Sequence, residues 1–258
     1  MEKLSIIIPQ YRTEDYIRLC LRALRKHTGG DAEVIVVDNN SSDGSIEYLK
    51  KVKWITLVEN NSGSIGSAAH KEALDLGIQK ATGGWVCLFH SDTIVLKDSW
   101  DAVLMDRVRK AGAAGLSTQV RDINPFEPWS EGLKARLSEL RKRAKQKLIS
   151  KVPREEKIMS YCFIVRKSVV EQSGFSFSRA EGDVVSSFYA RVIKGKHPFL
   201  LLGRDELMPL LWHTSNITSI LTGQITEESL VRKFNAKTGS LMRSRAVQEL
   251  LADPSLDR

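Results

Sequence analysis

Cysteine is scarce in this 258-residue sequence, and long apolar runs are missing from it. The three cysteines, Cys20, Cys87 and Cys162, lie among apolar neighbours and form no Cys-x-x-Cys pair. We therefore expect buried, reduced thiols rather than a disulfide framework or a cysteine zinc site. No apolar run approaches the roughly 20 residues that a membrane-spanning helix needs, and the first residues show no signal-peptide pattern. These features predict a cytoplasmic protein.

Internal repeats and low-complexity segments are also absent. Hydrophobic residues make up 42% of the chain and charged residues 27%, as is usual for a globular protein. The net charge of +8 suits an anionic partner such as a nucleotide, an anionic lipid surface or an acidic glycan. The same charge can instead serve only to keep the protein soluble. Nucleic-acid binding would rest on charge alone, so we expect no nucleic-acid partner.

The first half of the chain alternates short apolar runs with segments of helical period. The run Val34-Ile35-Val36-Val37 is β-branched and unbroken, as expected for a parallel strand covered on both faces. We expect strands at 4–8, 33–37, 54–58 and 85–89, and helices at 14–27, 43–51 and 65–81. This alternation predicts an α/β fold with a parallel sheet and right-handed crossovers.

The second half of the chain is less regular. We expect helices at 98–110 and 186–193, strands at 113–116, 159–165, 198–202 and 207–212, and a helical tail over 226–251 that is interrupted at Thr238-Gly239. A loop at 121–132 precedes a basic segment of helical period at 133–152. We divide one domain into a first half (1–120), an insertion (121–157) and a second half (158–258).

Polar clusters directly follow the four apolar strands of the first half. They are Pro9-Gln10-Tyr11, the stretch 38–44, the stretch 60–64, and His90-Ser91-Asp92. The carboxyl ends of parallel strands meet at one edge of a sheet, where ligands bind in open α/β folds. The sequence therefore predicts a polar crevice at that edge.

These motifs, in this order and spacing, resemble the nucleotide-binding half of family-2 glycosyltransferases over roughly residues 4 to 120. The resemblance implies the GT-A fold: a Rossmann-like, mostly parallel sheet with helices on both faces and, here, a helical C-terminal tail. It implies a metal-dependent, inverting transfer from a nucleoside diphosphate sugar, with a UDP-sugar favoured. The acceptor would be a hydroxyl of a glycan or of a lipid-linked saccharide, and the metal Mn²⁺ or Mg²⁺.

Within the resemblance, Pro9 and Tyr11 border the donor's base and ribose, and Asp38 contacts the uracil or ribose edge. For Asp38 an Asx turn is the alternative, and both roles can hold together. The other residues that the resemblance places at the nucleotide are Asn61, Gly63, Lys71 and Ser91. Lys71, with His70, takes the place of the family's Arg-Asn pair. A cation there meets the diphosphate or is simply solvated.

Asp92 matches the last acidic residue of the family's Asp-x-Asp motif and would hold the metal. The sequence departs from that motif at His90, where Asp is usual; imidazole suits Mn²⁺ better than Mg²⁺. His90 would otherwise face the nucleoside. His213 follows the apolar run that ends at Trp212. It would lie near the metal or the diphosphate, or it is structural.

The family's catalytic base belongs to a Glu-Asp pair that heads a helix. Here the match is Glu181-Gly182-Asp183, in which glycine separates the pair. Inverting transfer needs one carboxylate to deprotonate the attacking hydroxyl. We favour Asp183 as that base and keep Glu181 as the second candidate. A helix N-cap is the alternative role for Asp183.

Two other functions are compatible with parts of the sequence. A non-catalytic protein of the same fold that binds glycans or nucleotides is favoured by His90 and by the glycine between Glu181 and Asp183. A sugar nucleotidyltransferase would need a glycine-rich phosphate loop after the first strand, where the sequence reads Pro9-Gln10-Tyr11-Arg12. The segment 133–152 would be a solvated helix face, a peripheral contact with the inner face of a membrane, or a protein interface.

Overall fold

A seven-stranded sheet forms the centre of the molecule, in the order β3-β2-β1-β4-β7-β6-β8. The structure, a computed structural model, describes residues 2–126, 157–213, 215 and 217–258. The strands of the sheet are β1 (Leu4–Gln10), β2 (Ala32–Asp38), β3 (Ile55–Glu59), β4 (Trp85–Phe89), β6 (Gly115–Thr118), β7 (Cys162–Arg166) and β8 (Leu200–Leu202). Strands β1 to β4 run parallel, and β7 is antiparallel to both β4 and β6. The expected mostly parallel α/β sheet is thus confirmed.

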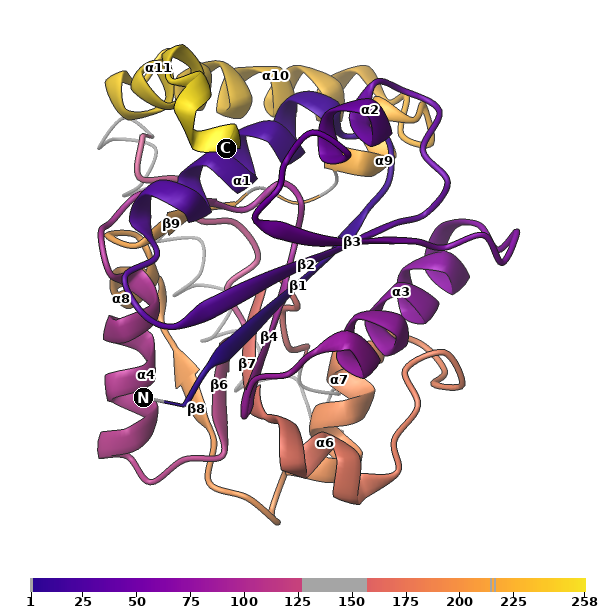
Figure 1. The fold of residues 1–258 in the computed structure, drawn as a ribbon, viewed down its shortest axis with the longest axis vertical. Coiled ribbons are helices and arrows are strands. Elements are labelled where there is room, and N and C mark those ends of the chain that lie inside the picture. The colour runs from indigo at the N-terminus through magenta and orange to yellow at the C-terminus, as the bar shows by residue number, and fades with distance from the viewer. Residues whose placement is uncertain (1, 127–156, 214, 216) are drawn as a thin grey trace.

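Helices cover both faces of this sheet (Figure 1). They are α1 (Glu14–His27), α2 (Ser45–Leu49), α3 (Gly66–Lys80), α4 (Trp100–Lys110), α6 (Lys167–Ser173), α7 (Val184–Phe188), α8 (Arg204–Leu207), α9 (Ile217–Leu221), α10 (Glu228–Met242) and α11 (Arg245–Ala252). Buried residues of α1, α2, α4, α10 and α11 share one core, and those of α3, α6 and α7 share the other. Successive residues of β1 alternate between these cores, since Ile6 and Ile8 belong to the first and Ile7 to the second.

Helix α3 lies unusually close to the sheet. A Cβ atom added to Gly77 would come within 2.3 Å of Cγ2 of the buried Ile7 on β1. Glycine inside a helix costs about 1 kcal/mol relative to alanine, and here it permits this close contact. The depth at which α3 packs on β1 therefore depends on the missing side chain of Gly77.

The four parallel strands end at the same edge of the sheet, as expected. Backbone hydrogen bonds continue past the strands there, from Asn39 N to Gln10 O (2.9 Å) and from Asn60 N to Asp38 O (2.8 Å). A separate two-stranded ladder of β5 (Ile94–Val95) and β9 (Leu211–Trp212) joins the chain after β4 to the second half of the sequence. The polar clusters of the sequence are thereby gathered into one region.

The structure differs from two of the expected elements. The apolar run 207–212 is not a single strand. Its first residue, Leu207, is the last residue of α8, and only Leu211–Trp212 pairs as β9. The tail is not interrupted at Thr238-Gly239, because α10 continues through both residues and the Thr238 hydroxyl donates to the Phe234 carbonyl one turn earlier (3.0 Å). The break falls instead at Ser244, which caps α11.

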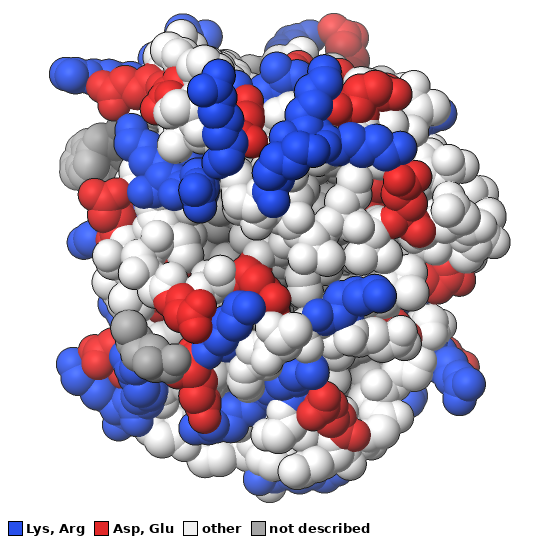
Figure 2. Space-filling view, in the orientation of Figure 1, with Lys and Arg blue, Asp and Glu red and all other residues white. Residues whose placement is uncertain are grey.

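None of the described helices combines the length and apolar character needed to cross a membrane. The basic segment 133–152 lies outside the described residues, so its expected membrane contact is not addressed by the structure. On the face shown in Figure 2, Lys and Arg side chains are interspersed with Asp and Glu. That face does not carry one continuous basic patch.

Glu33 ties β2 to the end of the sheet opposite the crevice. Its carboxylate accepts hydrogen bonds from the hydroxyl of Ser5 (2.6 Å) and from the backbone and hydroxyl of Thr82 (2.7 and 2.9 Å). Nζ of Lys3 lies 3.1 Å from Oε2 of Glu33. Burial alone would raise the pKa of Glu33, but these hydrogen bonds outweigh burial and lower the pKa to about 2.

We predict that Glu33→Gln lowers the free energy of unfolding by about 1–2 kcal/mol at pH 7. A carboxylate with a lowered folded-state pKa stabilises the protein above its unfolded-state pKa, and this contribution is lost as the pH falls toward 2. Urea unfolding at pH 7 and at about pH 3 should therefore show a smaller difference between variant and wild type in acid. The exposed Glu47 on α2 provides the control, Glu47→Gln. A difference that stays constant with pH would contradict the prediction.

Candidate active site

Two adjoining cavities lie at the carboxyl ends of the parallel strands. The larger, which we call the donor cavity, has a volume of about 480 Å³ and is bordered by the ends of β1, β2 and β3 and by the start of α3. The smaller, which we call the metal-side cavity, measures about 280 Å³ and contains His90, Asp92 and Asp183. Thr218 and Ser219 of α9 line both cavities, so a ligand can extend from one into the other.

The donor cavity contains four of the residues expected at the nucleotide: Pro9, Tyr11, Gly63 and Ser91. Gly63 has a positive φ of 78°, which only glycine adopts without strain. It shapes the turn between β3 and α3 that forms one wall. Local sequence motifs thus predicted the residues on one side of this cavity.

Other lining residues were not assigned from the sequence. Asn60 lines the cavity, whereas the expected Asn61 is exposed and lies outside the lining. The buried Asn60 side chain donates to Oδ1 of Asn39 (2.9 Å), which also lines the cavity. The available signal was an asparagine just after a predicted strand. Gln224, by contrast, reaches the cavity from the distant second half and has no local motif.

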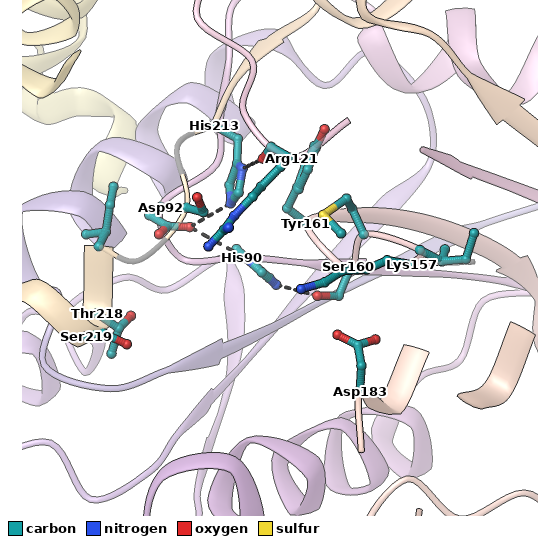
Figure 3. A pocket seen from close by; sticks show the side chains of 14 residues that line it. His90, Asp92, Arg121, Lys157, Ser160, Tyr161, Asp183, His213, Thr218 and Ser219 are labelled. Atoms are coloured by element: carbon teal, nitrogen blue, oxygen red, sulfur yellow. Dashed lines mark hydrogen bonds and ion pairs between the residues drawn. The ribbon is translucent and has the colours of Figure 1, made fainter. Parts of the chain in front are cut away.

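His90, Asp92 and His213 form a potential metal-binding cluster (Figure 3). One ligand atom from each residue lies within 4.8 Å of the others. Asp92 Oδ1 is 3.8 Å from Nδ1 of His90 and 3.7 Å from Nε2 of His213. His90 and Asp92 follow β4, and His213 follows β9, which the β5–β9 ladder brings alongside. In the part of the chain that the structure describes, this is the one such cluster of three or more ligands.

Hydrogen bonds orient both imidazoles toward Asp92. Nδ1 of His213 donates to the backbone carbonyl of Arg121 (3.1 Å), which leaves the lone pair of Nε2 facing Asp92. Nε2 of His90 bonds the hydroxyl of Ser160 (2.7 Å), so its Nδ1 faces the same carboxylate. Tyr161 stacks on the His213 ring at 4.0 Å between centroids. Partners of this kind fix the rings of metal-binding histidines.

Asp92 and His213 are buried and His90 is partly buried, and the electrostatics of the cluster suit a cation. Burial lowers the pKa of His213 to about 4 and holds the pKa of His90 well below its usual range, so both rings are neutral near pH 7. Burial also raises the pKa of Asp92 to about 7. Asp92 Oδ1 is buried and has no hydrogen-bond partner among the described residues. Two neutral imidazoles and a carboxylate oxygen without a partner fit a divalent transition metal.

Asp183 is the N-cap residue of α7, and it also lines the metal-side cavity. Its Oδ1 accepts from the backbone N–H of Ser186 (2.9 Å). Among the described residues, no group bonds its second oxygen, and Figure 3 shows the carboxylate pointing toward the cavity. Glu181 is exposed and outside the lining. Of the two candidate bases, only Asp183 lines the metal-side cavity.

A sequence model of Glycosyl transferase family 2 matches residues 5–174, about two thirds of the chain. The chain belongs to this family. The resemblance expected from the sequence is thus confirmed.

Curated relatives match less than half of this chain. The putative glycosyltransferase EpsH of Bacillus subtilis is 30% identical over 104 residues, which cover 39% of this chain and 29% of EpsH. A poly(ribitol-phosphate) beta-glucosyltransferase of Bacillus spizizenii is 33% identical over 99 residues, or 36% of this chain and 15% of that protein. The matched segments thus span less than a third of either relative.

Solved structures match nearly the whole chain. TarS residues 1–349 from S. aureus, in complex with UDP, has a TM-score of 0.56 at 14% identity and covers 96% of this chain and 70% of that one. The mannosyltransferase PcManGT from Pyrobaculum calidifontis, in complex with GDP-Man and Mn²⁺, has a TM-score of 0.58 at 14% identity, with 91% and 64% covered. At this identity the likeness establishes the GT-A fold.

In this chain, Asp38 lies buried at the end of β2 and is not part of the donor-cavity lining. Its Oδ2 accepts from the backbone N–H of Ser41 (2.9 Å), which matches the turn considered for it. Its Oδ1 is buried and has no partner among the described residues. Burial raises the pKa of Asp38. Asp38 can therefore close the turn with one oxygen and still have the other oxygen free to bind a donor.

Lys71 lies elsewhere than the sequence led us to expect. Its ammonium group donates to the backbone carbonyl of Ala180 (2.5 Å), and the residue is not part of the donor-cavity lining. His70, the preceding residue, does line the cavity. The helical spacing of α3 turns these neighbours in different directions, which the local sequence motif did not reveal.

We predict that Mn²⁺ binding weakens about tenfold between pH 8 and pH 6, because a proton on Asp92 competes with the metal. The histidines contribute little over this range, since the pKa of His213 is only about 4. Isothermal titration with MnCl₂ at several pH values measures the effect. Asp92→Asn should abolish binding, whereas Asp15→Asn, on an exposed carboxylate of α1, should leave it unchanged. A pH-independent affinity would refute the prediction.

Proposed function

We propose that this glycosyltransferase is metal-dependent and inverting, and that it moves a sugar from a nucleoside diphosphate sugar to a saccharide hydroxyl. The observation that carries the proposal is the buried Asp92 oxygen without a partner, which faces two neutral histidines between the donor cavity and Asp183. A cation is the ligand that such a group lacks. Mn²⁺ suits this nitrogen and oxygen set better than Mg²⁺.

His90, Asp92 and His213 would hold the metal. When bound, the cation supplies positive charge against the diphosphate that departs from the sugar. The donor cavity would take the nucleotide, with Pro9 and Tyr11 at the base and ribose. Gly63 and Ser91 would lie along the same wall. We leave Lys71 and Asn61 out of the nucleotide site, since neither lines the cavity.

We propose a UDP-sugar as the donor. Solved structures of TarS hold UDP and UDP-GlcNAc, and the mannosyltransferase PcManGT holds GDP-Man, so family relatives of this fold take more than one nucleotide. Asp38 is not part of the lining, but it directly precedes Asn39, which is. Its free oxygen would accept from the uracil N–H or from a ribose hydroxyl.

Asp183 would act as the general base. Its second oxygen takes the proton of the acceptor hydroxyl as that oxygen attacks the anomeric carbon from the side opposite the diphosphate. The bond between the sugar and the diphosphate breaks, and the configuration at the anomeric carbon inverts. The N-cap hydrogen bond to Ser186 holds the carboxylate still during this step.

The acceptor would be a glycan or a lipid-linked saccharide. Arg121 and Lys157 border the metal-side cavity, and cations there suit acceptors that carry phosphate groups. Two kinds of relative act on poly(ribitol-phosphate), according to their names. A cytoplasmic location, and membrane contact through 133–152, remain predictions of the sequence.

A thermal-shift series with UDP, GDP, dTDP and CDP, each with Mn²⁺, Mg²⁺ or EDTA, tests donor and metal together. A ligand that binds only the native state raises the melting temperature by mass action. We expect the largest rise with UDP and Mn²⁺, and its loss in Asp92→Ala. A rise that survives in EDTA would refute metal dependence, and a rise only with another nucleotide would refute the uridine assignment.

We predict that Asp183→Asn reduces turnover by about 10²- to 10⁴-fold, because the general base is lost. Asparagine still caps a helix well, so the variant should fold and should bind UDP with unchanged affinity. Release of UDP from UDP-GlcNAc measures turnover, and calorimetry measures binding. Glu181→Gln tests the other candidate: if that variant loses turnover and Asp183→Asn keeps it, Glu181 is the base.

A further inference from the structure

Helix α3 contacts two functional segments that are far apart in the sequence. The first is the donor loop, residues 60–66, which borders the donor cavity. The second is the base segment, residues 175–183, which links α6 to α7 and ends at Asp183. Figure 1 shows α3 lying beside α6 and α7 on one face of the sheet.

Asp75 of α3 holds the first part of the base segment. Its Oδ1 accepts from the backbone N–H of Phe177 (2.9 Å), and its Oδ2 accepts from the backbone N–H of Ser178 (2.9 Å) and from the hydroxyl of Ser176 (3.0 Å). Hydrogen bonds from amides to an ionised carboxylate are about twice as strong as neutral ones. One side chain thus fixes three consecutive residues of the segment.

Lys71 of α3 holds the second part. Its ammonium donates to the carbonyl of Ala180, three residues before Asp183. Lys71 and Asp75 are four residues apart on one helix, so they present their groups from the same face. The carboxylate takes the N–H groups of the segment and the ammonium takes a carbonyl. The positions of the two charges match the polarity of the backbone that each one binds.

Glu72, between these residues in sequence, holds the donor loop instead. Its carboxylate accepts from the hydroxyls of Ser62 (2.5 Å) and Ser64 (2.7 Å). Both serines belong to the stretch between β3 and α3. The same helix therefore bonds the wall of the donor cavity with one side chain and the base segment with two others.

We propose that Lys71 and Asp75 are positioning residues for the transfer reaction. They hold the base segment so that the Asp183 carboxylate stays at the metal-side cavity, and α3 couples that placement to the donor loop. The inference rests on the proposed function only in taking Asp183 as the base. The segment lies between Gly174 and Gly182, two glycines with positive φ. It is also held by the buried Phe177 and Ala180 and by a hydrogen bond from the Ser187 hydroxyl to the Glu181 carbonyl (2.8 Å).

Five variants of α3 test the two ends of the coupling separately. Asp75→Asn replaces one acceptor oxygen with an NH₂ group that faces a backbone N–H, and Lys71→Met removes the donor to Ala180. Glu72→Gln weakens the donor-loop contacts. Lys80→Gln removes an exposed charge in the last turn and is the matched control. Lys71→Arg keeps a cationic donor and should restore the behaviour of the wild type.

Hydrogen exchange of the backbone amides gives a readout that does not depend on activity. We expect Asp75→Asn to speed exchange of the Phe177 and Ser178 amides by about tenfold or more. Lys71→Met should speed exchange near Ala180. In the wild type, UDP with Mn²⁺ should slow exchange in the base segment. That effect should be lost in both variants.

The variants of the base segment's contacts should lower turnover, whereas the variant of the donor loop's contacts should weaken UDP binding. Misplacing a reacting group by about 1 Å can cost 10²-fold, so we expect Asp75→Asn and Lys71→Met to lower UDP release from UDP-GlcNAc by about 10- to 100-fold. Their affinity for UDP should stay within about twofold of the wild type, because the donor loop is intact. Glu72→Gln should instead weaken UDP binding and leave the Phe177 and Ser178 amides protected.

Unchanged exchange and unchanged turnover in Asp75→Asn and Lys71→Met would overturn the proposal. Equal loss of UDP affinity and turnover would overturn it too, because that pattern indicates general destabilisation. If Asp183→Asn keeps its turnover, the assigned base is wrong, while the exchange data still decide whether α3 holds the segment. If Asp75→Asn fails to fold, Lys71→Met provides both readouts, since it removes a single side-chain hydrogen bond.

Discussion

A buried carboxylate without a hydrogen-bond partner is the constraint on which this site depends. Burying an unpaired polar group costs several kcal/mol, yet Asp92 Oδ1 is enclosed between two histidines whose own rings are bonded away from it. The ladder of β5 and β9 brings His213 to this place, and Tyr161 stacks against it. Residues far from Asp92 in the sequence thus surround this one oxygen atom.

Two other acids combine a structural hydrogen bond with an oxygen that remains free. Asp183 caps α7 with one oxygen and presents the other to the cavity. Asp38 closes a turn with one oxygen and keeps the other buried and free. A carboxylate has two acceptors, so local backbone geometry can fix the side chain without consuming it. Cap and base, or turn and ligand, are therefore compatible roles for one residue rather than alternatives.

The parts of the site that the sequence predicted follow from strand periodicity. A buried strand is recognised by its apolar run, so the residues after β1 and β4, such as Tyr11, Ser91 and Asp92, could be placed at one edge of the sheet from the sequence alone. Residues that reach the site by tertiary packing could not be placed there from the sequence. Gln224 and Ser219 arrive from α9 and the turn after it, whose sequence has no motif linked to a nucleotide. Lys71 was misplaced for a related reason, since helical rotation separates it from His70.

The contact of Gly77 with Ile7 sets the height of α3 above the sheet, and with it the reach of every side chain on that helix. Changes in residues 60–66 alter the wall of the donor cavity, while α3 remains packed on β1. A methyl group at position 77 would lift the whole helix and disturb both of its attachments at once. Residues 60–66 can therefore vary without moving α3, whereas a side chain at Gly77 cannot be added without moving it.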